Sequence, residues 1–206
     1  MTNVSGKWKD SLLISGMITG IAAVHYFYMR SFWAENGTSP TSFRYIDWIL
    51  TVPLMCVEFY LILKAFGATV SLLWKMIGYS LLMLIAGYLG ETVYRDQSVM
   101  WGFISTIGYV GILYEVWLGS AKKLAGNSND PALQGAFKTL GWFVLVGWAI
   151  YPLGYILGTP GGLFGIQLVS DPAAAAHAMD IVYNIADAIN KIGFGLVIYA
   201  LSRKED

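Results

Sequence analysis

The chain has 206 residues, with 13 basic and 13 acidic side chains, so its formal net charge is zero. Hydrophobic residues make up 56% of it and charged residues only 13%, against roughly 25% charged residues in an average soluble domain. With a mean hydropathy of +0.57, this composition indicates a membrane protein and argues against a nucleic-acid partner. The single cysteine, Cys56, excludes an intrachain disulfide.

Six stretches are long and apolar enough to cross a bilayer, which takes about 20 residues of helix. In chain order they are residues 10–33, 41–63, 70–93, 99–118, 132–158 and 178–201. The segments between them are rich in Gly, Pro, Ser and Asn, as loops are. We therefore predict an all-α integral membrane helix bundle with six transmembrane helices, a single domain over residues 1–206.

The basic residues predict the orientation of these spans, because cytoplasmic loops carry an excess of Lys and Arg. One side of the six-span arrangement holds Lys7, Lys9, Lys64, Lys75, Lys122, Lys123, Lys138, Arg203 and Lys204. The other side holds Arg30, Arg44 and Arg95. The richer side is expected to face the cytoplasm, and both termini with it.

The second span contains "RYIDWILTVPLMCVEFY" at residues 44–60, with two carboxylates inside the expected membrane. At 1.5 Å of rise per residue, Asp47 lies roughly 9 Å from the outer end of this helix and Glu58 about 16 Å further in. The two acids share nearly one face, and Thr51 is one turn above Asp47. A carboxylate in hydrocarbon is costly, and it marks a functional site by default.

The sixth span carries Tyr183, Asp187 and Lys191 at intervals of four residues, on one helix face. Lys191 lies roughly 20 Å from the outer end, where a bare ammonium is disfavoured. A buried lysine loses its proton readily and can act as a Schiff-base nucleophile. A structural ion pair between Lys191 and Asp187 explains the same spacing equally well.

His25, in the first span, falls near the depth of Asp47, about 24 Å from the inner end of its helix. A packing or interhelical hydrogen-bonding role is the simpler interpretation. A carboxylate–imidazole pair is the sharper one, since it would hold Asp47 charged. Glu91 and Glu115 fall near span ends, where solvated or helix-capping roles are expected.

The fifth span contains Trp148, Tyr151 and Pro152, at spacings that put them on one face. Proline kinks are tolerated in membrane helices, and an aromatic stripe is usually packing. Together with Trp48 and Tyr183, however, this stripe could wall a flat, apolar, elongated ligand.

Six fragments of the sequence carry a family resemblance: "VHYFYMR", "SPTSFRYIDWILTVPL", "EFYLIL", "GYLGE", "GWAIYPLGY" and "YNIADAINKIGFGL". Over nearly its whole length the chain resembles the microbial rhodopsins, and most closely the proteorhodopsin group of bacterial light-driven proton pumps. The resemblance implies a seven-helix rhodopsin-type fold in the bacterial inner membrane, surrounded by lipid, with covalently bound all-trans retinal and no metal. Relatives form ring-like homo-oligomers, so a second copy of the chain is a candidate partner.

The resemblance also implies a role for each matching residue. Lys191 matches the lysine that carries retinal as a protonated Schiff base. Asp47 matches the proton acceptor and primary counterion, and Asp187 the second counterion. Glu58 matches the cytoplasmic proton donor, and Thr51 the middle position of the three-residue pumping signature.

Further matches extend the same implied site. His25 matches the histidine that proteorhodopsins pair with the acceptor, and Arg44 the arginine on the exit path. Met55 stands at the colour-governing position, where an apolar side chain implies green absorption. The implied retinal pocket comprises Trp48, Trp148, Tyr151, Pro152 and Tyr183.

Two features depart from the family pattern. The segment "SGKWKDSLLISG" at residues 5–16 matches the connector and the start of the family's second helix, so the first helix is missing. We expect an N-terminally incomplete sequence rather than a natural six-helix pump. A lipid-facing groove would then be left open. Tyr109 occupies a position where many relatives have a pocket Trp, which is expected to alter ring packing and colour but not retinal binding.

The leading functional hypothesis is a retinal-dependent, light-driven outward proton pump, which is an ion transporter and not an enzyme. Glu58 favours it, because pumps need an internal proton donor. One alternative is a photosensory rhodopsin that signals through a partner. A second is a chromophore-free membrane protein in which Lys191 and Asp187 merely pair. A third is an inactive, truncated fragment.

Overall fold

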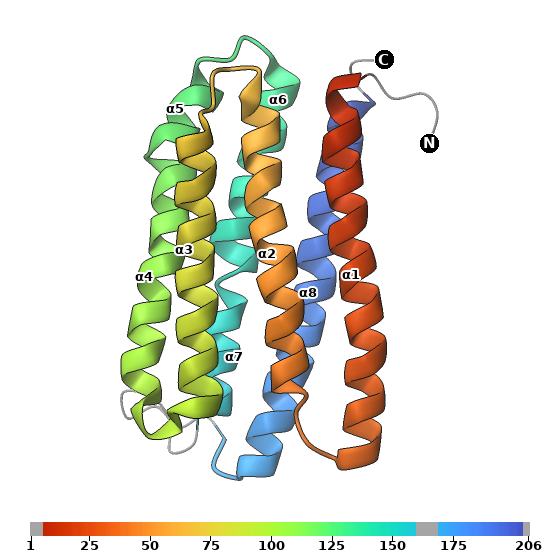
Figure 1. The fold of residues 1–206 in the computed structure, drawn as a ribbon, viewed down its shortest axis with the longest axis vertical. Coiled ribbons are helices and arrows are strands. Elements are labelled where there is room, and N and C mark those ends of the chain that lie inside the picture. Colours follow the sequence, from red (N-terminus) through yellow and green to blue (C-terminus); the bar gives the residue numbers. More distant parts are fainter. Residues whose placement is uncertain (1–5, 160–168, 204–206) are drawn as a thin grey trace.

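The computed structural model describes residues 6–159 and 169–203, which form helices running side by side (Figure 1). The helical segments of this part of the chain are α1 (Gly6–Asn36), α2 (Thr41–Lys64), α3 (Val70–Tyr88), η1 (Leu89–Val93), η2 (Arg95–Gln97), α4 (Ser98–Trp117), α5 (Ser120–Gly126), α6 (Pro131–Trp142), η3 (Phe143–Gly147), α7 (Ile150–Gly158) and α8 (Pro172–Ser202). Within the described residues, six helical crossings are long and apolar enough to span a membrane. The predicted all-α bundle with six membrane helices is confirmed.

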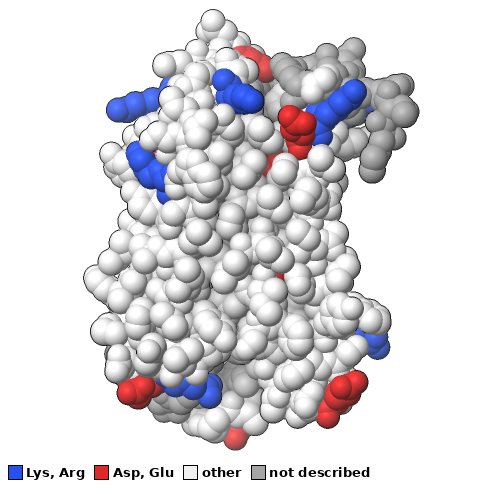
Figure 2. Space-filling model, viewed as in Figure 1, with Lys and Arg blue, Asp and Glu red and all other residues white. Residues whose placement is uncertain are grey.

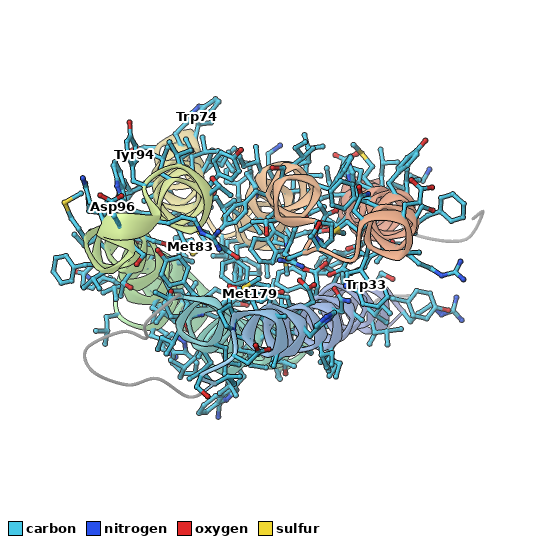
Figure 3. All side chains as sticks on the ribbon, turned by 90° about the horizontal axis from the view of Figure 1, so that it is seen from below. Trp33, Trp74, Met83, Tyr94, Asp96 and Met179 are labelled. Carbon is cyan, nitrogen blue, oxygen red and sulfur yellow. The ribbon has the colours of Figure 1, made fainter. Side chains whose placement is uncertain are left out.

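The crossings form two facing rows. Seen from the lower end of the bundle, α1, α2 and α3 make up one row, and α7 and α8 lie opposite them (Figure 3). α4 packs against α3, and α8 packs against both α7 and α1. Met83 points between the rows, whereas Trp74 points away from them (Figure 3). α1 begins and α8 ends at the same end of the bundle, the upper end in Figure 1.

α8 exposes apolar side chains and buries polar ones, the opposite of a helix on the surface of a soluble protein. Its outward face is a stripe of aliphatic side chains, each more than half exposed: Ile181, Ile185, Ile189, Ile192 and Leu196. The middle of its buried face carries the polar side chains Tyr183, Asp187, Asn190 and Lys191. On the face drawn in Figure 2, charged side chains gather at both ends, with an almost uncharged band between them. An apolar surface of this extent lies in lipid, which makes the chain a multi-pass membrane protein.

Two of the long crossings start with the same device, an aspartate followed by proline. The Asp130 side chain accepts a hydrogen bond from the backbone N–H of Ala132 at 2.8 Å, and Asp171 accepts one from Ala174 at 2.7 Å. Each bond satisfies one of the free N–H groups of a first helical turn, and proline fits the first helical position. α8 therefore begins at Pro172, ahead of the apolar stretch at residues 178–201.

The fifth crossing is not one continuous α-helix. Between α6 and α7, the π-helical turn η3 and a short irregular turn redirect the backbone, and the carbonyl groups released there find side-chain partners. The Tyr109 hydroxyl lies 2.9 Å from the carbonyl oxygens of both Val144 and Leu145. Asn190 Nδ2 donates to the carbonyl of Gly147 at 3.1 Å. A bend in a membrane helix is tolerated where neighbouring side chains satisfy its backbone in this way.

At Gly108 the backbone of α4 lies directly against the backbone of α3. A Cβ atom at this position would lie 2.5 Å from the carbonyl oxygen of Tyr79 and 2.7 Å from the backbone nitrogen of Met83. Both obstacles are backbone atoms, which cannot move aside as a flexible side chain can. The absence of a side chain at residue 108 therefore fixes the spacing of these two helices.

Gly108→Ala should consequently push α3 and α4 apart and destabilise the protein by about 1–3 kcal/mol, the usual cost of overpacking. Gly78→Ala on α3 is the matched control, because a Cβ at residue 78 meets nothing within 4 Å. Thermal melts of the two variants in detergent measure the difference. Equal melting temperatures would show that the helix spacing is not set at Gly108.

Candidate functional site

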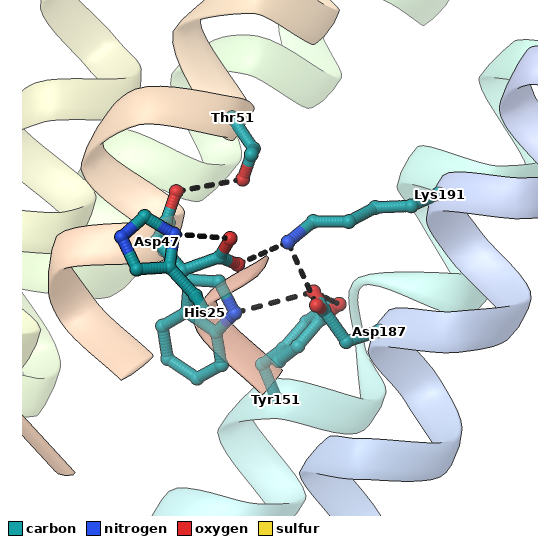
Figure 4. A network of polar contacts seen from close by, with 7 residues as sticks. His25, Asp47, Thr51, Tyr151, Asp187 and Lys191 are labelled. Carbon is teal, nitrogen blue, oxygen red and sulfur yellow. Dashed lines mark hydrogen bonds and ion pairs between the residues drawn. The ribbon is translucent and has the colours of Figure 1, made fainter. Parts of the chain in front are cut away.

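α2 and α8 bring three ionisable side chains into direct contact in the middle of the bundle (Figure 4). Lys191 Nζ is within ion-pair distance of Asp47 Oδ2, and it lies 2.7 Å from Asp187 Oδ2. Lys191 is 3% exposed, Asp187 1% and Asp47 0%. A buried cation is tolerated only when anions and hydrogen bonds surround it. The two carboxylates supply that surrounding.

The second carboxylate oxygen of Asp187 also accepts hydrogen bonds. Its Oδ1 accepts hydrogen bonds from Trp48 Nε1 at 3.2 Å and from the Tyr151 hydroxyl at 3.1 Å (Figure 4). Including Lys191, three donors from three different helices converge on this one carboxylate. The aromatic residues that the sequence predicted as pocket walls thus also orient Asp187.

Asp47 has fewer partners. His25 Nδ1, from α1, lies 3.3 Å from Asp47 Oδ1, at ion-pair distance, although neither atom makes a hydrogen bond in the described structure. The Thr51 hydroxyl donates to the backbone carbonyl of Asp47 at 2.9 Å and not to its carboxylate (Figure 4). The depth argument that paired His25 with Asp47 agrees with this geometry. Thr51 lies one turn along the helix, as its spacing requires.

A cavity of about 300 Å³ lies beside this cluster, enclosed mainly by α2, α3, α4 and α7. Its walls are aromatic, aliphatic and sulfur-containing, and they include Trp48, Met55, Met83, Tyr109, Trp148, Tyr151, Pro152, Tyr155 and Tyr183. No charged side chain lines it among the described residues. Trp48 and Tyr151, the two side chains that donate to Asp187, belong to the cavity wall, whereas Lys191 itself does not line the cavity. This size and lining are typical of a site for a small apolar ligand.

Glu58 is completely buried on the half of α2 nearer the upper end of the bundle. Its Oε1 accepts a hydrogen bond from the Ser15 hydroxyl of α1 at 2.7 Å, and its Oε2 has no partner. No cation lies within ion-pair distance of Glu58 among the described side chains. Glu58 is therefore separate from the Lys191 cluster and differs from it in having neutral hydroxyl groups, those of Ser15 and Ser11, as its neighbours.

Arg44 is fully buried toward the lower end of the bundle and pairs with Asp180 on α8, which the sequence analysis did not single out. The Ser39 hydroxyl donates to the same Asp180 oxygen at 2.6 Å. The Arg44 guanidinium also lies over the Tyr183 ring, 4.8 Å from its centroid. Asp180 and Ser39 line a polar cavity of about 450 Å³. Asp180 precedes Tyr183 by three residues, so helical spacing could have found it.

The two glutamates near span ends have specific partners. Glu115 is 2% exposed, lies 2.9 Å from Lys75 Nζ and accepts a hydrogen bond from the backbone N–H of Ser120 at the start of α5. It is therefore a capping residue but not a solvated one. Glu91 sits in the π-helical turn η1 and accepts a hydrogen bond from the Tyr45 hydroxyl at 2.7 Å.

Comparisons with known proteins bear on what this arrangement does. The chain is 45% identical over 205 residues to a green-light absorbing proteorhodopsin of Gamma-proteobacterium EBAC31A08, covering 98% of this chain and 77% of that protein. It is 44% identical over 204 residues to the blue-light absorbing proteorhodopsin of Gamma-proteobacterium Hot 75m4, with the same coverage. Its fold matches the crystal structure of the blue light-absorbing proteorhodopsin from Med12 with a TM-score of 0.80 and 44% identity, covering 100% of this chain and 88% of that one.

The model of the family described as bacteriorhodopsin-like proteins matches residues 1–204, almost the entire chain. This match agrees with the buried lysine between two carboxylates and with the apolar cavity beside it. The chain therefore belongs to the bacteriorhodopsin-like proteins, a family of light-driven ion pumps that bind retinal through a Schiff base to a lysine and are not enzymes.

Proposed function

We propose that this protein is a light-driven pump that moves protons out of the cell, with retinal attached to Lys191. The chain is one transmembrane domain over residues 1–206 in the bacterial inner membrane, with its C-terminus in the cytoplasm. The excess of basic residues on the side where α8 ends supports this orientation. The observation that carries the proposal is the Lys191 amine held between the carboxylates of Asp47 and Asp187.

The cavity beside Lys191 suits retinal, an apolar polyene with one reactive end. None of the described residues that line it is charged, and the rings of Trp48, Trp148 and Tyr183 offer flat surfaces to a conjugated chain. Trp48 and Tyr151 line the cavity and donate to Asp187, the carboxylate that also binds the Lys191 amine, so the amine is linked to the cavity wall through Asp187. When bound, retinal supplies a cationic nitrogen at Lys191 and a change of shape on absorbing light.

The unequal partners of the two carboxylates support Asp47 as the proton acceptor. Asp187 receives hydrogen bonds on both oxygens, and such bonds stabilise the ionised form of an acid. Asp47 receives one donor, Lys191, and faces His25 with its other oxygen. The acid with fewer donors is the better place for a proton, so Asp47 Oδ2 takes it from the Lys191 nitrogen while Asp187 stays charged.

Glu58 gives the transport its direction. It lies eleven residues beyond Asp47 on α2, about 16 Å nearer the proposed cytoplasmic end. A proton leaves the Lys191 nitrogen toward Asp47 on the outer side, and Glu58 replaces it from the inner side. Because acceptor and donor lie on opposite sides of one nitrogen, each cycle carries a proton outward. A signalling rhodopsin has no need of the second acid.

Arg44 and Met55 have further roles in the proposed pump, one on the proton exit path and one in the colour of the protein. Arg44 lies between the Lys191 cluster and the polar cavity at the lower end, which fits a place on the exit path. Met55 lines the apolar cavity, where its uncharged side chain supports green absorption. Tyr109 lines the same cavity, and its hydroxyl donates to backbone carbonyls of η3, so its ring is held in the wall.

Lys191→Ala should abolish the visible absorption band that all-trans retinal gives with the purified protein, because it removes the only amine that the described residues place at the site. Lys75→Ala, which changes a lysine on α3 that pairs with Glu115, is the control and should keep the band. Absorption spectra recorded after adding retinal decide between them. A visible band in the Lys191→Ala protein would refute the attachment site.

Asp47→Asn should shift the visible band to longer wavelength and stop pumping, because the acceptor and half of the counterion charge disappear. Asp96→Asn, at an exposed position in η2, should pump normally. The measurement is the pH of an unbuffered suspension of illuminated cells, with and without a protonophore. Persisting acidification by the Asp47→Asn protein would assign the acceptor to another residue. A coloured wild-type protein that never acidifies the medium would favour a photosensor.

Glu58→Gln should leave the colour unchanged but slow the recovery of the Lys191 proton by about a hundredfold, within the usual contribution of a positioned acid. Time-resolved absorption after a laser flash measures this recovery. Glu115→Gln, at a second buried acid near the same end, should recover at the wild-type rate. Unaltered kinetics in the Glu58→Gln protein would rule out its donor role.

A further inference from the structure

Three side chains of α8 pack against the fifth crossing at positions where that crossing has glycine. The pairs are Asn190 with Gly147, Tyr183 with Gly154 and Met179 with Gly158. A Cβ atom on any of these three glycines would overlap the α8 side chain opposite it. Because the two elements fit together without spare room, a shift of α8 acts directly on the fifth crossing.

Asn190 differs from the other two side chains because it binds the backbone at the bend of the fifth crossing. Its Nδ2 donates to the carbonyl of Gly147 at 3.1 Å, and Gly147 is the last residue of the π-helical turn η3. From α4, the Tyr109 hydroxyl binds the carbonyls of Val144 and Leu145 in the same turn. The carbonyl groups of the bend are therefore held by one helix on each side, α4 and α8.

Packing alone does not account for an amide at residue 190. Asn190 is 1% exposed, and its Oδ1 has no hydrogen-bond partner among the described residues. A buried polar atom without a partner is costly, and an aliphatic side chain could fill the same space without that cost. What an aliphatic side chain cannot supply is the hydrogen bond to the Gly147 carbonyl.

The position of Asn190 in the chain gives this hydrogen bond its significance. Asn190 directly precedes Lys191 within the continuous helix α8, so the backbones of the two residues move together. Gly147 directly precedes Trp148, which lines the apolar cavity. One hydrogen bond thus joins the neighbour of the buried lysine to the neighbour of a cavity-wall residue.

We infer that Asn190 is a positioning residue that transmits a displacement of Lys191, through the Gly147 carbonyl, to the bend at η3. This inference rests on the proposed attachment of retinal to Lys191. On illumination, a shift of the α8 backbone at Lys191 carries the Asn190 amide with it, and the amide displaces the Gly147 carbonyl. Because Tyr109 holds the other carbonyls of the turn to α4, the movement changes the bend itself and reaches the adjoining helix α6.

The test measures the light-induced movement of α6 in the full-length, retinal-loaded protein. Spin labels attached through Trp74→Cys on α3 and Lys138→Cys on α6, in a Cys56→Ser background, report the distance between the two helices by double electron–electron resonance. Both labelled positions are exposed. α3 is a suitable reference because its backbone rests against that of α4.

Asn190→Leu keeps the approximate size of the side chain and removes the donor to Gly147. It should reduce the light-induced distance change about twofold and slow the return to the dark state about tenfold, within the range for residues that couple two sites. The visible band should remain, because Asn190 does not line the cavity. Met179→Leu, at the Gly158 contact of the same seam, is the matched control and should leave both measurements at their wild-type values.

Tyr109→Phe distinguishes loss of transmission from a general loosening of the bend. It removes the hydrogen bonds from α4 and leaves the Asn190 amide on Gly147, so the light-induced distance change should grow instead of shrinking. A decrease like that of Asn190→Leu would show that any weakening of the bend lowers the movement. That result would count against transmission by Asn190.

Wild-type movement and wild-type return in the Asn190→Leu protein would overturn the inference. If Asn190→Leu does not assemble with retinal, Asn190→Ala, which is smaller than the native residue, carries the same expectation. A wild-type protein that acidifies the medium without any light-induced distance change would refute the inference and leave the pump function standing. A visible band in the Lys191→Ala protein would instead refute the attachment site, and with it the premise of the inference.

Discussion

The burial of one ammonium group in the middle of a membrane is the constraint on which the rest of this structure depends. Lys191 has almost no contact with solvent, so its charge must be balanced by groups that the protein supplies. Asp47 and Asp187 provide that balance from two different helices, which fixes how α2 and α8 face each other. Trp48 and Tyr151 then complete the hydrogen bonds of Asp187 and at the same time form the cavity wall. One charge thus organises both the electrostatics and the shape of the site.

Much of the fold and the centre of the site follow from two regularities of the sequence. The bilayer sets the length of an apolar stretch, and the helical repeat sets which residues share a face. Depth and periodicity alone put Asp47 and His25 at one level and Lys191 one turn from Asp187, and the contacts agree with both. The roles of these residues in transport came from the family resemblance, since geometry cannot distinguish a structural ion pair from a working one.

Other features depend on contacts that no local pattern encodes. The partner of Arg44 is Asp180, 136 positions away, and only the packing of α2 against α8 brings the two together. The π-helical turn η3 is equally hidden, because an apolar run reads as one helix until a neighbour is present to bind the released carbonyls. Tyr109 does so from α4. Long-range hydrogen bonds of this kind decide where a helix bends, and a single span of sequence does not contain them.

The close backbone contact between α3 and α4 at Gly108 limits which helices can move when a bound ligand absorbs light. Since the backbone of α4 rests directly on that of α3, these two helices make a rigid partition that cannot recede. A ligand that straightens or bends against it must displace whatever lies opposite. That opposite boundary is α7, joined to α6 through a bend whose carbonyls are held by only a few side chains. A change in ligand shape is therefore expected to move α7, next to the bend at η3, while α3 and α4 stay in place.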